Sequence, residues 1–226
     1  MNFLSHFYFD RYSEDSHLVL GTVLPDLVKN ARKDWNIHPE KNEHLFASPS
    51  EKAILEGWKR HLKVDRHFHN SGFFIEHTGQ IRKAITPALS NSIVRPSFLA
   101  HIALELMLDS TLLIREHVRT NDFYGHLRES DREALKRFLI LSKVDNTDHF
   151  FTFYDKFIHS QYLDRYREND NIVYALKRIC MRIWDNPLTE NEVIELNKIL
   201  NDYHQNLLGN YMDIYEEIHV KLLKEG

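Results

Sequence analysis

Residues Ser97–Ile114 read SFLAHIALELMLDSTLLI and form the most apolar stretch of the chain. If this stretch is helical, its apolar side chains lie on nearly every side, and no wide polar face remains to turn toward water. A helix that is apolar all round is typical of a protein interior. The stretch therefore predicts the central helix of the fold.

Capping sequences on both sides of this stretch mark further helices. Ser48-Pro49-Ser50-Glu51 has the form of a capping box with proline at the first helical position, and it predicts a helix that runs to about His69. Ser130–Glu133 and Thr189–Glu192 have the same form, and Gly209 divides the apolar stripe that follows the latter into two helices. We also expect helices near residues 13–31, 73–87, 147–166 and 169–185, with breaks at Lys33–Phe46, Leu89–Pro96, Thr120–Glu129 and Asp185–Leu188.

The composition fits one helical domain. The chain has 226 residues, of which 42% are hydrophobic and 27% are charged, so it holds enough apolar material for a substantial core. Its 7 glycines and 6 prolines are few, whereas a β-sandwich or barrel needs many turn residues and a disordered chain holds less apolar material. We therefore predict a single all-α domain over residues 1–226.

The net charge and the cysteine content indicate which binding partners and which cellular compartment fit the protein. The formal net charge of -4 argues against a broad nucleic-acid-binding face. The single cysteine, Cys180, excludes a disulfide framework and fits a reducing environment. Met1–Asp10 is apolar but lacks the basic segment of a signal peptide, and no uninterrupted apolar run reaches membrane-spanning length. We expect a cytoplasmic protein that binds neither nucleic acid nor membranes, and the oligomeric state stays open.

Histidine is unusually frequent, with 15 residues in the chain. His61 and Asp65 are four residues apart on one predicted helix, and His69 lies a further four residues along. Side chains at this spacing share a helix face, so one metal ion or one water molecule could contact both His61 and Asp65. For this pair alone, the alternative is an ion pair on the protein surface.

A second pair, His101 and Glu105, has the same spacing on the predicted central helix, and Asp109 follows four residues later. A carboxylate in so apolar a helix is costly to bury unless it is paired, protonated or bound to a metal. Two interpretations of the His101–Glu105 pair therefore remain open, a buried structural pair and a metal site.

Two more polar residues lie among apolar neighbours. Asp26 is flanked by valine and leucine residues, and His6 lies in an aromatic stretch where a histidine is either a hydrogen-bonded core residue or a ligand. Together with the two His-x3-acid pairs, these residues predict one shared metal site. Its candidate ligands are His6, Asp26, His61, Asp65, His101 and Glu105.

Other kinds of active site find little support in the sequence. The chain contains no G-x-S-x-G nucleophile motif, no Walker loop and no G-x-G-x-x-G loop. A phosphate group would therefore have to be held by metal and arginine. Arg165, Arg167 and Arg178 offer a basic strip, which is either a solvated face or a docking surface for an acidic partner or a phosphate.

The order of these motifs resembles that of the acyl-carrier-protein phosphodiesterase family. The likeness extends over most of the chain and is carried by Met1–His6, Gly21–Asp26, Gly57–Asp65 and Arg165–Arg167. It implies an all-α enzyme, an HD-like helical bundle distantly like the HD-domain metal phosphohydrolases. Such an enzyme removes the 4′-phosphopantetheine group from holo acyl carrier protein, usually with manganese.

The resemblance also carries over to individual residues. By position, Asp26, His61 and Asp65 would belong to the metal site, with His6 nearby. Members of the family tend to carry an Asp-x3-Asp pair on the central helix, where this chain has His101 and Glu105. The spacing is kept, but the more nitrogen-rich ligand set shifts the expected metal from Mn²⁺ towards Zn²⁺, and Mg²⁺ or Fe²⁺ also fit.

A further similarity is to zinc-dependent phospholipase C and P1-type nucleases, which are likewise all-α phosphodiesterases. Those enzymes are usually secreted and begin with a processed tryptophan, and neither feature is seen in this sequence. The ligand types predict metal-assisted hydrolysis of a phosphodiester. For the carrier-protein substrate that the resemblance implies, an acid outside the ligand set would protonate the departing serine oxygen. Candidate catalytic residues are Asp65, His69 and Asp109.

Two alternatives to this function stay open. The substrate could be a nucleotide or another phosphodiester rather than the carrier protein. The protein could also be a catalytically silent helical binding module that kept the fold and lost the metal.

Overall fold

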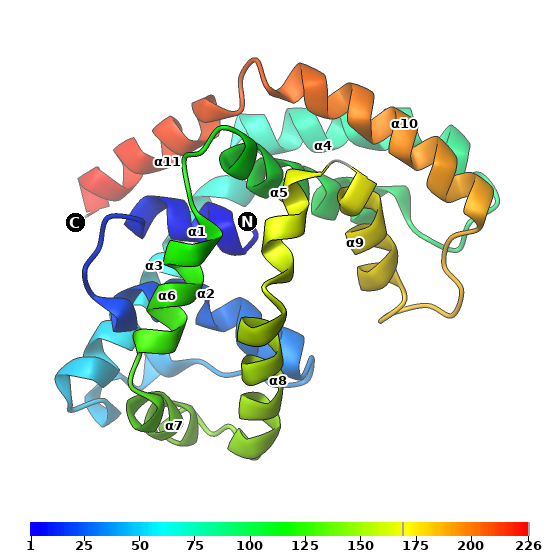
Figure 1. Cartoon of the computed structure of the whole chain (residues 1–226). Helices are drawn as coiled ribbons and strands as arrows, with labels where there is room; N and C mark the ends of the chain where they lie inside the picture. Colours follow the sequence, from blue (N-terminus) through cyan, green and yellow to red (C-terminus); the bar gives the residue numbers. More distant parts are fainter. Residues whose placement is uncertain (169, 226) are drawn as a thin grey trace. The chain divides into compact units, whose positions relative to one another are not determined.

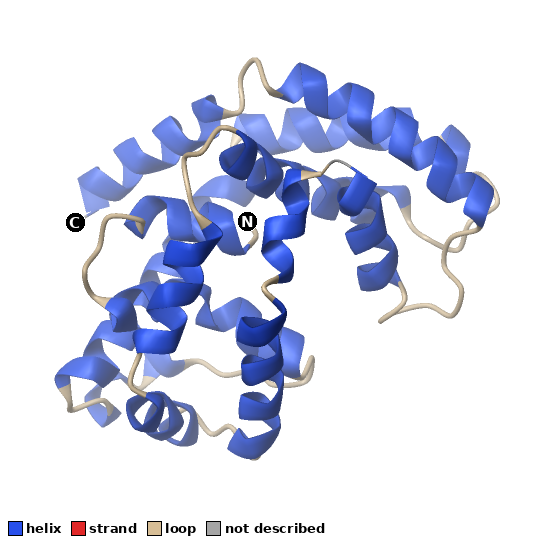
Figure 2. Cartoon of the chain, viewed as in Figure 1, coloured by secondary structure: helices blue, strands red, loops and turns tan. Residues whose placement is uncertain are grey.

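The computed structural model describes residues 1–168 and 170–225, and every regular element among them is a helix (Figure 2). The prediction of an all-α protein is confirmed. Residue contacts divide the chain into two compact units, each built from two segments that are separated in sequence. The first unit comprises Met1–Asp65 and His117–Leu163, and the second comprises Arg66–Glu116 and Asp164–Gly226.

Helix α2 is the hub of the first unit. It contacts α1, α6 and α8, and its buried residues are almost all aliphatic. The first unit contains α1 (Phe3–Asp10), α2 (Ser16–Ala31), most of α3 (Pro49–His69), α6 (Thr120–Glu129), α7 (Arg132–Leu141) and α8 (Thr147–Ser160), with the short turns η1 (Pro39–Lys41) and η2 (Glu43–Leu45).

Helix α5 (Pro96–Ile114) is the hub of the second unit. It contacts α4 and α9, and α4 runs side by side with α10 (Figure 1). The predicted central helix is therefore confirmed within this unit. The other elements are α4 (Gly72–Ile85), η3 (Pro87–Leu89), η4 (Tyr162–Arg167), α9 (Asp170–Cys180), α10 (Glu190–Leu207) and α11 (Met212–Glu225).

By length and composition alone, α5 is apolar enough to cross a membrane. However, 67% of its most apolar window is buried inside the protein. Burial of this kind is what the core helix of a folded domain shows, and it accounts for the apolar character of all its sides.

Helices α2 and α3 meet at two glycines that leave no room for a side chain. A Cβ atom on Gly21 would lie 2.2 Å from the carbonyl oxygen of Ile54, and one on Gly57 would lie 2.1 Å from that of Leu18. Both distances are far inside van der Waals contact, so only glycine lets the two backbones approach so closely. The contact presses α3 against α2 one turn before His61.

The predicted capping boxes are formed with one adjustment. Helix α3 begins at Pro49 and ends at His69, as predicted. Thr189 and Glu192 form the reciprocal hydrogen bonds of a capping box at the start of α10. At α7 the cap is Asp131 rather than Ser130, because the Asp131 carboxylate accepts hydrogen bonds from two main-chain N–H groups of the first turn.

Helix α6 occupies a stretch where the sequence predicts a break, so that prediction is wrong. Phe123, Tyr124 and Leu127 are buried and share one side of the helix. The helix is only 10 residues long and contains Gly125 among several polar residues. So short an amphipathic pattern does not stand out from a loop in the sequence, and packing of the apolar side decides the structure.

Two predicted helices end early. Helix α8 stops at Ser160 because Gln161 has a φ of 45°, in the left-handed region that terminates helices, and the turn η4 follows. Helix α9 ends at Cys180 rather than near residue 185. Its predicted start at residue 169 lies outside the described residues.

His204 of α10 is buried against α5. Its Nε2 lies 2.7 Å from Thr111 Oγ1, and the Thr111 hydroxyl donates to the Met107 carbonyl oxygen at 2.8 Å. The Thr111 oxygen therefore accepts a hydrogen bond from His204 Nε2–H. Burial lowers the pKa of His204 from 6.5 to about 4.

This shift predicts acid sensitivity. Between pH 6.5 and about 4 the unfolded chain binds a proton at His204 and the folded chain does not, so the stability present above pH 6.5 is lost as the pH falls. The loss over this window is roughly 3 kcal/mol. Urea unfolding of the wild type and of His204→Gln at pH 4.5 and 7.5 measures it, with exposed His219→Gln as the control. An equal pH dependence in wild type and His204→Gln would contradict the assignment.

Candidate metal centres

The first unit brings together His6, His61 and Asp65, here called the first-unit group. His61 and Asp65 lie one turn apart on α3, and His6 comes from α1. One potential ligand atom of each residue lies within 4.8 Å of the others. His6 Nε2 is 3.2 Å from Asp65 Oδ1, and His61 Nε2 is 3.6 Å from Asp65 Oδ2. The spacing of four residues thus places two ligands together, and a different helix supplies the third.

A main-chain carbonyl orients His61. Its Nδ1 lies 2.8 Å from the Thr22 carbonyl oxygen, so Nδ1 carries the proton and Nε2 keeps its lone pair. The His6 ring stacks on the His61 ring at a centroid distance of 3.8 Å. Burial, together with the neighbouring His6, lowers the pKa of His61 well below 6.5. Histidine binds a metal as a neutral imidazole, through one ring nitrogen, while its other ring nitrogen donates a hydrogen bond to a group such as a carbonyl oxygen.

Asp65 is held in its ionised form. Its Oδ1 accepts a hydrogen bond from the amino nitrogen of Met1 at 2.6 Å and lies beside His6. Burial alone would raise the pKa of Asp65, but the hydrogen bond from His6 and the charge of the amino group outweigh it and hold the pKa far below its usual range. A carboxylate must be deprotonated to bind a metal, so Asp65 is in the ligand form.

The second unit brings together His69, His101 and Glu105, here called the second-unit group. His101 and Glu105 lie one turn apart on α5, and His69 is the last residue of α3. His101 Nε2 is 3.0 Å from Glu105 Oε1, and His69 Nε2 is 3.5 Å from the same oxygen. The two Nε2 atoms are 3.1 Å apart. Three potential ligand atoms therefore converge on one point.

Phe74 of α4 fixes the imidazoles of the second-unit group. Its ring meets His69 and His101 edge-on, at centroid distances of 5.1 and 4.9 Å. Ser71 closes the turn between α3 and α4, because its side chain accepts a hydrogen bond from the Phe74 N–H at 3.0 Å. The aromatic ring therefore forms an apolar wall on one side of the two histidines.

The donor atoms of the second-unit group fit a divalent ion. Ligand atoms held about 2.1 Å from one ion lie about 3.0 to 3.4 Å apart in octahedral or tetrahedral arrangements. The three separations of 3.0, 3.1 and 3.5 Å fall close to this range. Two imidazole nitrogens and one carboxylate oxygen suit Zn²⁺, Mn²⁺ or Fe²⁺. The first-unit group offers the same donor set, so each unit carries two histidines and one carboxylate.

The two groups differ in access. The side chains of His69 and His101 are 33% and 38% exposed. Those of His6 and His61 are 0% and 4% exposed. A substrate in solution can therefore reach the histidines of the second-unit group directly, whereas the histidines of the first-unit group lie inside the protein.

The structure regroups the residues that the sequence assigns to one site. His69, predicted as a catalytic residue, joins His101 and Glu105 as a candidate ligand. Asp26 and Asp109 belong to neither group. Asp26 is half-buried on α2, and Asp109 lies fully buried one turn after Glu105 on α5. A ligand role for Asp26 and a catalytic role for Asp109 stay predictions.

The basic strip is only partly free to bind a partner. Arg165 and Arg178 are exposed. The Arg167 guanidinium donates to the carbonyl oxygen of Leu113, near the end of α5, at 2.8 Å and pairs with Asp164 at 3.1 Å. A cation is favourable at the C-terminus of a helix, so Arg167 serves the fold of the second unit.

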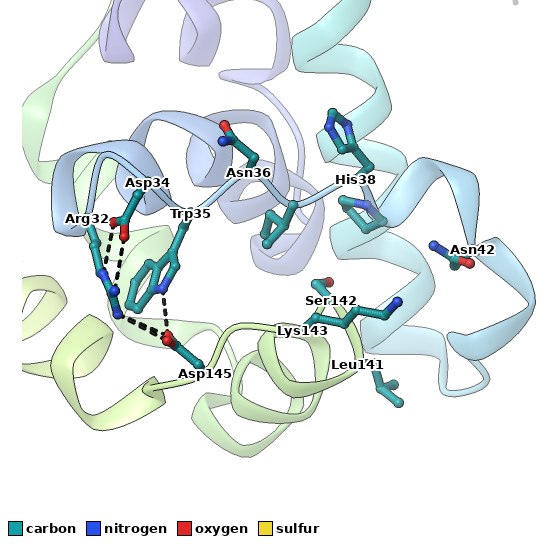
Figure 3. Close-up of a pocket in the computed structure, with 12 residues that line it drawn as sticks. Arg32, Asp34, Trp35, Asn36, His38, Asn42, Leu141, Ser142, Lys143 and Asp145 are labelled. Carbon is teal, nitrogen blue, oxygen red and sulfur yellow. Dashed lines mark hydrogen bonds and ion pairs between the residues drawn. The ribbon is translucent and has the colours of Figure 1, made fainter.

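The first unit contains a hollow of about 450 Å³ between the end of α2 and the turn before α8, drawn in Figure 3. Three of its charged side chains pair with one another. Arg32 lies between Asp34 and Asp145, at 2.9 and 3.1 Å, and Trp35 Nε1 donates to Asp145 at 2.7 Å (Figure 3). These contacts fasten the α2 end to the loop and leave no convergent set of ligand atoms there.

Two features of the metal groups escape prediction from the sequence. Thr22 contributes a main-chain carbonyl, for which no residue type is required, and Phe74 lies on a helix whose packing is not encoded locally. The two glycines are the feature of the sequence that could have indicated this contact. Gly21 directly precedes Thr22, and Gly57 precedes His61 by one turn. A pair of helical glycines so placed indicates a close crossing of two helices.

No family model matches the chain, and no curated protein or solved structure matches it either. The geometry of the two metal groups and the motifs of the sequence are therefore the features that indicate a function.

Proposed function

We propose that the protein is a divalent-metal-dependent phosphodiester hydrolase whose substrate binds at the second-unit group. The observation that carries the proposal is the convergence of His69, His101 and Glu105, with separations of 3.0 to 3.5 Å and with solvent access to both histidines. Structural metal sites usually surround their ion with four protein ligands, whereas hydrolytic sites offer three and leave a position open. Three donors with an exposed side match the hydrolytic arrangement.

Each residue of the second-unit group would have its own role in hydrolysis. A bound divalent ion would lower the pKa of a water molecule from 15.7 to about 7 and polarise a phosphoryl oxygen. His69 and His101 offer nitrogen donors through Nε2, and Glu105 offers the negative charge that offsets part of the charge of the ion. Phe74 holds the imidazole planes and excludes water from one side, so that substrate and water approach from the exposed side.

The proposed substrate is holo acyl carrier protein, from which the enzyme would release 4′-phosphopantetheine. The support is the resemblance carried by the motifs around His6, Asp26, His61 and Asp65. In this proposal the first-unit group holds a metal as well, with Mn²⁺ as the first choice and Zn²⁺ next. A nucleotide phosphodiester and a silent binding module are the alternatives that the tests below separate.

Incubation of holo acyl carrier protein with the purified protein and Mn²⁺ is expected to remove the phosphopantetheine mass from the carrier protein. Intact-mass spectrometry detects the product as apo carrier protein, and His101→Ala is expected to abolish its formation. Unchanged carrier protein together with cleavage of an aryl phosphodiester would favour the nucleotide alternative. Unchanged carrier protein, no cleavage of any diester and no bound metal would favour the silent module.

Replacing the two exposed arginines, Arg165 and Arg178, by alanine is expected to raise the KM for holo carrier protein several-fold and to leave kcat within about twofold. The carrier protein is acidic, and surface charges act mainly on encounter and weak docking. Arg167→Ala is a poor substitute because its guanidinium holds the Leu113 carbonyl. Steady-state kinetics against carrier protein concentration measure both constants. A fall in kcat with unchanged KM would instead place these arginines at the phosphate.

A further inference from the structure

An open hollow of about 620 Å³ lies in the second unit beside the second-unit group. It is lined by Arg95, Ser97, Phe98, His101, Ile183 and Trp184. His101 therefore belongs both to the candidate metal ligands and to the wall of the hollow. A molecule seated in the hollow would have one end next to the metal group.

Arg95 supplies a free cation at this hollow. Its side chain is exposed, and in the part of the chain that the structure describes its guanidinium makes no hydrogen bond or ion pair. Arg66 of the same unit, by contrast, pairs with Glu225 at 2.9 Å. An uncommitted guanidinium can bind two phosphate oxygens at once without first breaking a protein contact.

The opposite wall of the hollow is apolar and aromatic. Phe98 and Trp184 meet edge to face, with ring centroids 5.4 Å apart and planes at 82°. Ile183, which also lines the hollow, is 47% exposed. Half-buried aromatic side chains and an exposed aliphatic one beside a cation and a metal group are typical of a site for an amphipathic ligand.

We propose that this hollow, named the Arg95–Trp184 pocket, binds the organic part of a phosphoester whose phosphate lies between Arg95 and the second-unit group. The proposal rests on the proposed function, because it assumes that the phosphate is the group delivered to the metal. The ligand chemistry is a phosphate joined to an apolar or planar arm. Two sources share that chemistry, a pantetheine arm and a nucleoside.

Product binding tests the pocket without requiring hydrolysis. Full-length protein is titrated calorimetrically with 4′-phosphopantetheine, with AMP and with inorganic phosphate. We expect one of the two organic phosphates to bind at least tenfold more tightly than inorganic phosphate, and the tighter of the two identifies the source of the arm. Trp184 fluorescence gives a second readout, since Trp35 and Trp58 are buried.

Three variants assign the binding to the pocket. Arg95→Gln is expected to weaken the organic phosphates about tenfold, and the matched control Arg82→Gln, an exposed arginine of α4, is expected to change nothing. Trp184→Ala is expected to abolish the preference over inorganic phosphate. Trp184→Phe, which keeps an aromatic ring, is expected to retain the preference and to lose the fluorescence change.

The outcomes separate the pocket from the proposed function. If Arg95→Gln and Trp184→Ala bind every ligand as the wild type does, the pocket assignment is overturned even when metal-dependent hydrolysis is observed. Binding of inorganic phosphate as tightly as both organic phosphates also overturns it. If Arg95-dependent binding is found but no diester is hydrolysed, the pocket stands and the proposed function fails.

Discussion

Glu105→Gln is expected to reduce phosphodiester hydrolysis at least about 100-fold while leaving the protein folded. The amide keeps the shape of the side chain but removes its negative charge and the better of its donor oxygens. Metal stabilisation of a phosphoryl transition state amounts to several kcal/mol, and each 1.36 kcal/mol corresponds to a factor of ten in rate. Losing the charged ligand of the group should therefore cost at least two factors of ten.

The measurement pairs initial rates with calorimetric metal titration. Metal affinity and rate should fall together in Glu105→Gln and in His101→Ala. Glu216→Gln, an exposed glutamate of α11, is the matched control and should behave as the wild type does. Full activity in Glu105→Gln combined with inactivity of His61→Ala would move the catalytic centre to the first-unit group.

Gly57→Ala is expected to destabilise the protein by at least about 3 kcal/mol. The added methyl group would lie 2.1 Å from the Leu18 carbonyl oxygen and 2.7 Å from Gly21 Cα, and both are main-chain atoms that cannot rotate away. Overpacking of a tight contact typically costs 1–3 kcal/mol, and a backbone clash is at the upper end or beyond. For a chain of this length the expected fall in Tm is roughly 6–12 °C.

Gly125→Ala is the matched control for the glycine contact. A Cβ atom on Gly125 of α6 meets nothing within 4 Å, so the substitution should raise stability by about 0.5–1 kcal/mol through helix propensity alone. Thermal unfolding followed by circular dichroism compares the two variants. Equal Tm values for Gly57→Ala and the wild type would show that α2 and α3 are not in main-chain contact.

The clash caused by Gly57→Ala is also expected to disturb the first-unit group. Gly57 precedes His61 by one turn of α3, and Gly21 precedes Thr22 on α2. Pushing the two helices apart would lengthen the 2.8 Å bond from His61 Nδ1 to the Thr22 carbonyl oxygen. Any Gly57→Ala protein that folds should therefore bind metal more weakly than Gly125→Ala does. A hydrogen bond that orients a metal-binding histidine contributes about 10–100-fold to metal affinity.

Local features of the sequence predict the helices that have strong local signals. The capping box at Ser48–Glu51 predicts α3 at both ends, and the uniform apolarity of Ser97–Ile114 predicts α5 as a core helix. Helix α6 is missed because its apolar side is short and its stability comes from packing against α2. The early end of α8 depends on the left-handed conformation of Gln161, a residue that carries no such signal.

The residues of the metal groups likewise fall into those that the sequence predicts locally and those that depend on tertiary packing. The pairs His61–Asp65 and His101–Glu105 follow from the spacing of four residues, because helix geometry alone brings such residues together. The third ligand of each group, a histidine from another helix, depends on which helices pack together. His6 reaches Asp65 from α1, and the sequence gives no local sign of that contact. Sorting the candidate ligands into groups therefore required tertiary structure.

The division of each unit into two separated segments affects synthesis as well as architecture. Helices α1 and α2 leave the ribosome early, but α6 and α8, which cover α2, follow only after the intervening residues 66–116. At typical translation rates that interval lasts roughly 3–10 s. During this time Met1–Asp65 can form the glycine contact between α2 and α3, while the remaining aliphatic side of α2 stays uncovered. For several seconds the nascent chain thus exposes an apolar surface to which chaperones bind. Because each unit consists of two separated segments, neither unit can be produced as one continuous fragment.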